Sequence, residues 1–312
     1  MLFVSRHNNI TDKEVNYVQE RTKPQYRCAY ILSSIIKSHE SFSHGPLFSE
    51  WLKQRKKRWT LEYTIVQAVL MAFDQSASLK DRFGNARQCL VEMFPSRVRP
   101  GKTYQGLVKA LRRIPSEIPE QLQLHLCRQH QKVAGSSWKV YGWIPFAADG
   151  SRVETPRTKA NQESLGCAGK KKTGPQLLLT TLYHMGSGLP WRWAIGAGTD
   201  SERGQLRGML KTLPLGSLIV ADAGFTGYDL LKDIMSHDLS FLIRVGANVT
   251  LLKNLGFEFE QHGNTVWLWP HSKRDQEPLK LRLIQVKTKT KHIPKKHDVY
   301  LLTNVFDSER LS

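Results

Sequence analysis

Apolar residues in the first half of the chain recur every three or four positions, the spacing that lines one face of a helix. This pattern predicts three helices: Leu61–Phe73, a second helix that begins after the capping residue Ser78, and Thr103–Arg113. Basic side chains gather at the end of the last of these helices. We therefore expect short helices from Phe42 to about Ala134, an arrangement that suits groove binding, with a plain helical bundle as the alternative.

The pattern changes after Gly135–Ser137, a small polar stretch typical of a hinge. Beyond it, short apolar runs are bounded by glycine, proline and polar residues, which predicts strands. Two amphipathic segments, Ser201–Leu213 and Tyr228–Met235, are predicted to be helices. The predicted strands are Lys139–Ala148, Gln176–His184, Pro190–Ile195, Leu218–Ala221, Ser240–Val245, Thr250–Leu252, Thr265–Trp269, Leu279–Val286 and Val299–Leu302.

Three consecutive strands followed by two helix-linked strands predict a mixed α/β sheet with helices on its faces. Because crossovers between parallel strands are right-handed, the later strands should return beside the first one. The strand before Asp149 and the strand before Asp222 would then be neighbours, although the two residues are far apart in the sequence.

Both of these aspartates directly follow an apolar run, and a glycine-containing turn follows each of them. A carboxylate at the carboxyl end of a buried strand is where open α/β sheets place their chemistry, although an ordinary turn aspartate has the same pattern. Acidic residues on neighbouring strands can share two divalent cations about 3.5–4 Å apart, which hold the attacking and leaving oxygens of a phosphoryl displacement. Oxygen ligands suit hard ions such as Mg²⁺.

The charge balance points to a polyanionic partner. The chain of 312 residues has 46 Lys and Arg against 27 Asp and Glu, a formal net charge of +19. No apolar run approaches the roughly 18 residues that span a bilayer, and Met1–Asn9 lacks the apolar core of an export signal. Nucleic acid is therefore the expected partner and the cytoplasm the expected location. The basic runs Lys53–Arg58 and Lys287–Lys296 fit phosphate contacts and solvated surface equally well.

Four scattered cysteines without a Cys-x-x-Cys pair indicate neither a zinc ribbon nor a disulfide framework. Cys127 and His130 lie three residues apart and make at most half a zinc site, so structural roles are favoured for them. Unpaired thiols also fit a reducing cytoplasm.

The two aspartate motifs, Ala148–Ser151 and Ala221–Tyr228, resemble the first and second acidic motifs of the DDE transposases in the insertion-sequence family usually called "IS-four". Ser201–Leu206 and Phe241–Val245 also resemble that family in order and spacing. The resemblance implies an N-terminal leader at 1–41, a helical DNA-binding domain at 42–137 and a ribonuclease-H-like catalytic domain at 138–312. A β-rich insertion is then expected at about residues 247–302.

The resemblance also implies roles for individual residues. Asp149 and Asp222 would bind two Mg²⁺ or Mn²⁺ ions and activate a water or a 3′ hydroxyl for attack on a DNA phosphodiester. The candidate DNA contacts are Lys170, Lys171, Lys172, Arg203 and Arg244. Arg203 could instead order the strand ends near the acids or form a surface salt bridge. Trp191 and Trp193 are expected in the core. The partners would be transposon ends and target DNA, with a homo-oligomer compatible with this function.

The third acidic motif of that family, a Tyr, an Arg, a Glu and a Lys along one helix, is not found. It normally follows a stretch like Leu301–Asn304, and here only a few residues remain before Ser312; Glu309 lies too early. We therefore expect a C-terminally truncated enzyme with impaired strand transfer and one partly bare sheet face. The alternatives are a catalytically inactive DNA-binding remnant that interferes with full-length transposase, and another ribonuclease-H-like nuclease such as a junction resolvase.

Overall fold

The computed structural model describes residues 58–94, 99–115, 117–168, 174–245, 258–270, 275–286 and 299–311. The chain divides into two compact units, Met1–Glu120 and Gln121–Ser312. Several expected features lie outside the described residues: the leader at 1–41, most of the basic run Lys53–Arg58, the lysines Lys170, Lys171 and Lys172, the strand Thr250–Leu252 and the basic loop Lys287–Lys296.

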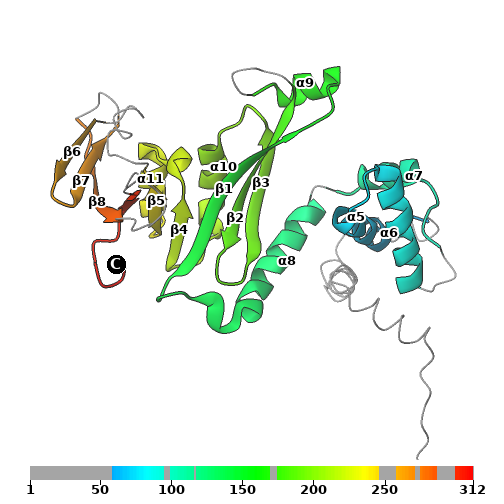
Figure 1. Ribbon diagram of the computed structural model, residues 1–312, viewed down its shortest axis with the longest axis horizontal. Helices are drawn as coiled ribbons and strands as arrows, with labels where there is room; N and C mark the ends of the chain where they lie inside the picture. The colour runs from blue at the N-terminus through cyan, green and yellow to red at the C-terminus, as the bar shows by residue number, and fades with distance from the viewer. Residues whose placement is uncertain are drawn as a thin grey trace, which may run out of the picture. The chain divides into compact units, whose positions relative to one another are not determined.

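The described part of the first unit is helical (Figure 1). Each of its three helices begins behind a hydroxyl cap, Thr60, Ser78 or Thr103, which accepts a hydrogen bond from a backbone amide of the first turn. Apolar side chains from all three helices, with Trp59, form one buried cluster. The predicted helices of this region are thus confirmed, and their bounds are α5 (Leu61–Phe73), α6 (Leu79–Met93) and α7 (Tyr104–Leu111).

The boundary between the two units differs from the expected hinge. It falls between Glu120 and Gln121, inside helix α8 (Glu117–Ala134), whereas Gly135–Ser137 belongs to the 3₁₀ turn η1 (Gly135–Trp138). The reason is that α8 is bound to the sheet of the second unit. The amide of Gln123 donates to the carbonyl of Trp193 at 3.4 Å, and the thiol of Cys127 donates to the carbonyl of Trp191 at 2.9 Å.

In the part of the chain that the structure describes, nine strands form one mixed sheet in the order β3-β2-β1-β4-β5-β9-β8-β7-β6 (Figure 1). Strands β1, β4 and β5 are parallel to one another, and β2, β3 and β9 are antiparallel to their neighbours. Strand β4 therefore returns beside β1, as the crossover rule predicts. The bounds are β1 (Ile144–Glu154), β2 (Gln176–His184), β3 (Leu189–Ala197), β4 (Ser217–Ala221), β5 (Ser240–Arg244), β6 (Glu258–His262), β7 (Thr265–Trp269), β8 (Leu279–Val286) and β9 (Val299–Thr303).

Strand β1 corrects the prediction that its strand ends before Asp149. It begins at Ile144 and continues to Glu154. Its parallel pairing with β4 stops at Ala148, but its antiparallel pairing with β2 continues to Glu154. The extension is polar and mostly exposed, so no apolar pattern marks it in the sequence.

One helix lies where the sequence predicts none. Between β1 and β2 is helix α9 (Lys159–Leu165), which begins behind Thr158 and buries none of its residues, so it shows no apolar face in the sequence.

The described strands at the expected β-rich insertion belong to the same sheet. Strand β9 pairs directly with β5, and β8, β7 and β6 extend the sheet outward.

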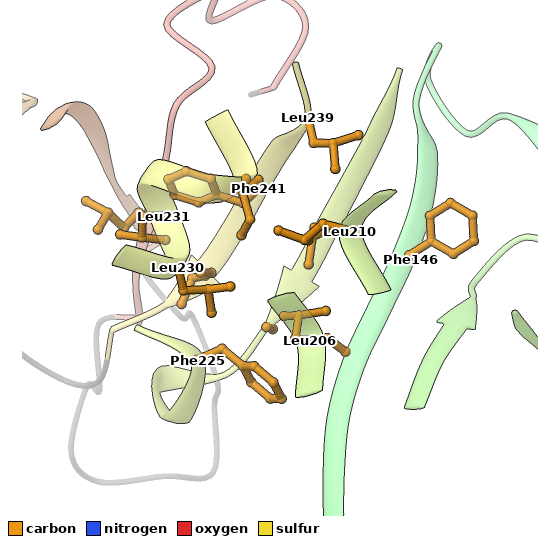
Figure 2. Packing of buried hydrophobic residues seen from close by; sticks show 14 of the residues in the cluster. Phe146, Leu206, Leu210, Phe225, Leu230, Leu231, Leu239 and Phe241 are labelled. Carbon is orange, nitrogen blue, oxygen red and sulfur yellow. The ribbon is translucent and has the colours of Figure 1, made fainter. Parts of the chain in front are cut away.

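One face of the sheet is covered by two α-helices of the second unit and the 3₁₀ turns beside them. These are α10 (Glu202–Met209) with η2 (Leu210–Thr212), and α11 (Tyr228–Ser236), which follows η3 (Ala223–Phe225). Their buried side chains converge on strand side chains such as Phe241 (Figure 2). An ion pair between Arg207 and Asp233 links α10 to α11.

The opposite face is covered at one end by the stretch that follows β9. There Val305 and Leu311 pack with Trp143 and Leu218. The indole of Trp143 donates to the carbonyl of Arg310 at 3.2 Å, and the guanidinium of Arg310 lies 4.1 Å from the indole ring centre. We call this second face the site face, because the aspartates lie on it.

Candidate active site

Asp149 and Asp222 occupy matching positions on two adjacent parallel strands. The last in-register pair of β1 and β4 is Ala148 with Ala221, and each aspartate is the next residue. Adjacent strands lie about 4.8 Å apart. Because side chains alternate along a strand, both aspartates project from the site face, opposite the face that carries Ala148 and helix α10. The structure thus brings the two predicted acids together.

Both carboxylates are exposed, and each uses one oxygen to fix the local backbone. Oδ1 of Asp149 accepts the amide of Gly150 at 2.9 Å, and Oδ1 of Asp222 accepts the amide of Gly224 at 2.9 Å. The second bond caps η3 and holds the turn after β4. Among the described residues, no Lys, Arg or His forms an ion pair with either aspartate. The pair therefore presents negative charge to solvent.

Arg244 extends the same row of residues. Ile243 of β5 pairs with Ala221 of β4, and Arg244 and Asp222 are the next residues on the two strands. Arg244 therefore lies beside Asp222 on one side, as Asp149 does on the other. Its side chain is exposed at the end of β5. The row therefore has a basic side chain directly beside the two acids. The structure therefore places one of the predicted DNA contacts next to the predicted metal ligands.

On the other side of Asp149 the row continues through two residues that the sequence analysis did not assign to the site. Asp149 pairs with Thr181 of β2, and Thr181 pairs with Trp193 of β3. Paired residues of neighbouring strands share a face, so Trp193 lies on the site face and is only partly buried. Trp191, in contrast, is buried in the core with 8% of its surface exposed, as expected. Only the strand register could have distinguished these two tryptophans.

Arg203 reaches the same region from the helical side. Its guanidinium donates to the carbonyl of Thr226 at 3.1 Å, and an added Cβ at Gly227 would lie 3.0 Å from Nη1 of Arg203. Arg203 thus fixes the turn that begins at Asp222. The geometry corresponds to ordering of the strand end rather than to a surface salt bridge.

A third carboxylate, Glu202, lies close to β1 but on the opposite face. Its side chain packs over Gly150, where an added Cβ would lie 2.4 Å from Cδ of Glu202, and it forms an ion pair with Arg152 at 3.0 Å. Gly150 alternates with Asp149, so Glu202 lies on the helix side of the sheet. Within the described ranges, no group of three or more His, Cys, Asp or Glu is positioned to hold a metal ion.

Cys127 and His130 serve the core, as favoured from the sequence. The thiol of Cys127 donates to the carbonyl of Trp191, and burial raises the pKa of this thiol to about 11. The ring of His130 packs edge-on against Trp191 at a centroid distance of 5.2 Å. Both residues therefore help to attach α8 to β3.

The helices of the described residues include none that combines the length and apolar character needed to cross a bilayer. The fold is that of an α/β protein with a mixed sheet, in which two acids lie at matching positions just beyond the parallel pairing of two adjacent strands. Residues 144–311 match the family model described as the transposase DDE domain. This match covers more than half of the chain, and the chain belongs to that family.

Comparison with solved structures finds similarity to piggyBac transposase, determined by cryo-electron microscopy as a synaptic complex with hairpin DNA. The TM-score is 0.39 and the sequence identity 16%, and the match covers 89% of this chain and 61% of that chain. The chain thus matches less than two thirds of the length of that transposase chain. No curated protein matches the sequence significantly.

Proposed function

We propose that this protein acts in DNA transposition, as a DDE transposase that cleaves and joins DNA at transposon ends with the help of Mg²⁺ or Mn²⁺. The observation that carries the proposal is the placement of Asp149 and Asp222 one residue beyond the same in-register pair of β1 and β4. Membership of the transposase DDE family supports it. Cytoplasmic location, assembly as a homo-oligomer on DNA and a ribonuclease-H-like core made of β3-β2-β1-β4-β5 are parts of the same proposal.

The donor set fits a hard divalent cation. Mg²⁺ in phosphoryl-transfer sites is typically held by one or two carboxylates, with water and substrate phosphate completing its coordination. Asp149 and Asp222 each have one oxygen bound to a backbone amide, which fixes the orientation of the carboxylate. When bound, two such ions would stabilise the attacking and leaving oxygens of an in-line displacement.

The remaining residues of the site position the DNA and the acids. Arg244 is placed to contact the phosphate next to Asp222, where a fixed cation offsets the charge that develops during transfer. Arg203 keeps the turn from Asp222 to Gly227 in place through the carbonyl of Thr226. Lys170, Lys171 and Lys172 remain candidate phosphate contacts from the sequence.

We further propose that strand transfer by this chain is weak. Within the described ranges no third carboxylate joins Asp149 and Asp222, and Glu202 lies on the opposite side of the sheet bound to Arg152. The second ion would then lack a protein ligand. A DNA-binding protein that interferes with complete transposase is the competing function, supported by the net charge of +19.

A plasmid-nicking assay tests the proposal. The wild-type chain should nick supercoiled DNA with Mn²⁺ or Mg²⁺ and not with EDTA. Asp149→Asn and Asp222→Asn keep the side-chain size and remove the charge, so each should reduce nicking by at least about 100-fold. Asp229→Asn, at an exposed aspartate in the first turn of α11, is the matched control and should nick as wild type.

The outcomes separate the two functions. Nicking that persists in Asp149→Asn would refute the two-acid site. Salt-sensitive DNA binding without nicking in either metal would favour the interfering DNA-binding protein over the enzyme.

A further inference from the structure

Five of the nine basic residues in the described part of the first unit lie on one segment, 99–115, which contains α7. This segment has no aspartate or glutamate, and all of its basic side chains are exposed. The acids of the described first unit lie on α5, on α6, on the connection between them and on the first turn of α8. The basic residues of the segment are Arg99, Lys102, Lys109, Arg112 and Arg113.

Three exposed residues, Gln105, Lys109 and Arg112, form a stripe on the outer side of α7, because Leu107 and Ala110 are buried against α5 and α6. Their spacing of four and three positions places them along one helix face. Lys102, also exposed, directly precedes the N-cap Thr103 and adds a basic side chain at the start of the helix. We call these four residues the α7 stripe. At 1.5 Å per residue its helical part is about 10 Å long, within the width of about 12 Å of the major groove of DNA.

The segment that carries the stripe is held rigidly. The indole of Trp59 lies so close to Gly101 that an added Cβ would be 2.1 Å from Nε1, and the corresponding distance at Gly106 is 3.0 Å. The guanidinium of Arg87 donates to the carbonyls of Gly101 and Pro100 at 2.9 and 3.4 Å. Such fixed geometry lowers the ordering cost of binding.

We propose that the α7 stripe is the duplex-reading surface of this protein and enters the major groove of DNA. Lys102, Lys109 and Arg112 would contact phosphates, and Gln105, between them, would reach base edges, where glutamine pairs with adenine. The proposal rests on the proposed function for its partner, duplex DNA. An anionic membrane fits less well, because membrane-surface helices bury apolar side chains and the stripe contains none.

Salt-dependent binding tests the phosphate contacts. The full chain is titrated in EDTA onto a labelled mixed-sequence duplex of about 20 bp, two helical turns, at salt between about 50 and 200 mM. The triple variant Lys102→Gln, Lys109→Gln, Arg112→Gln should make the plot of log affinity against log salt shallower by about 2.7, that is, about 0.9 for each lost contact. The control variant Lys80→Gln, Lys132→Gln, Lys139→Gln loses the same charge from exposed sites elsewhere and should keep the wild-type slope.

Equal losses in the two triple variants would overturn the proposal, because they would show a general charge effect. A loss of binding to phosphatidylserine vesicles in the stripe variant, with DNA binding unchanged, would also overturn it. The binding titration needs no metal. Its result can therefore be interpreted even if Asp149→Asn still nicks DNA and the two-acid site is refuted. Wild-type affinity in the stripe variant, together with metal-dependent nicking, would refute the stripe and leave the proposed function standing.

Selection from random duplex DNA tests Gln105. Wild type should enrich a motif, and Gln105→Ala should reduce discrimination at one or two adjacent positions by about tenfold while mixed-sequence affinity stays unchanged. Gln88→Ala, at an exposed glutamine of α6, is the matched control and should preserve the motif. An unchanged motif in Gln105→Ala would refute base reading by the stripe.

Discussion

The residues of the site differ in what holds them in place. Asp149 lies inside a paired strand, whereas Asp222 lies in a turn that depends on its own bond to Gly224 and on Arg203. The two arginines near the acids also differ. Arg203 is bound to the backbone of the chain, and Arg244 is exposed at the end of β5. Substitution of Arg203 should therefore affect nicking, and substitution of Arg244 should affect DNA binding.

We expect Arg203→Ala to reduce metal-dependent nicking by about tenfold, because loss of the bond to Thr226 lets the Asp222 turn move, and small misplacements of reacting groups are costly. Its DNA affinity should stay close to wild type. Arg244→Ala should instead weaken DNA binding. The slope of log affinity against log salt should become shallower by about 0.9, since one phosphate contact is lost. Nicking rates at saturating DNA and binding isotherms measure the two effects. A shallower salt dependence in Arg203→Ala would show that Arg203 contacts DNA directly.

Among the elements, α8 is attached to the sheet through two buried histidines. His130 of α8 and His184 of β2 are 4% and 0% exposed. Nδ1 of His184 accepts the amide of Ser187 at 3.0 Å, and its Nε2 then donates to the carbonyl of Trp138 at 3.1 Å. This pattern requires the neutral ring. Burial lowers the pKa of both histidines, and the charge of His184 lowers that of His130 further.

The sign of the pH dependence follows from these shifts. Because the folded-state pKa values lie below the unfolded value of about 6.5, the unfolded chain binds more protons as the pH falls below that value. The stabilisation by the neutral rings is complete above about pH 6.5 and is lost toward acid, with a slope of at most about 1.4 kcal/mol per pH unit for each histidine. Urea midpoints between about pH 7.5 and 5 should show this loss. His130→Gln should flatten the dependence and the exposed control His237→Gln should not; equal curves for His130→Gln and wild type would contradict it.

The bounds of helices and strands are predicted well from the sequence where one face of the element is buried and the other is exposed. The strands Gln176–His184, Thr265–Trp269 and Leu279–Val286 and the helix Leu61–Phe73 have the predicted bounds, because their apolar residues face a core. The polar end of β1 and helix α9 were missed because they bury little.

The candidate site could be predicted from the sequence only in part, because only some of its residues are marked by an apolar run. Asp149 and Asp222 follow apolar runs and could be found from the sequence, and the crossover rule places their strands side by side. Thr181 and Trp193 enter the site through antiparallel register alone, and a register shift lies one position away, between Leu182 and Tyr183. A shift of one residue would turn Trp193 to the other face of the sheet, so its position could not be derived from spacing.

For the whole molecule, two compact units with separate buried clusters imply two unfolding events. The cluster of α5, α6 and α7 and the cluster of the sheet with α10 and α11 share no residue. Stability in such a chain is not a single number, because each cooperative unit has its own transition.

Matched leucine substitutions, one in each cluster, test this division. Leu90 of α6 and Leu231 of α11 are both fully buried, so Leu90→Ala and Leu231→Ala should each cost about 2–5 kcal/mol. Calorimetry of the full chain should show two transitions, with Leu90→Ala lowering only one and Leu231→Ala only the other. DNA binding through the α7 stripe should weaken when the first unit is unfolded, and the sheet that carries Asp149 and Asp222 should remain folded. A single transition lowered equally by both variants would show one cooperative unit, in which the stability of the α7 stripe depends on that of the sheet.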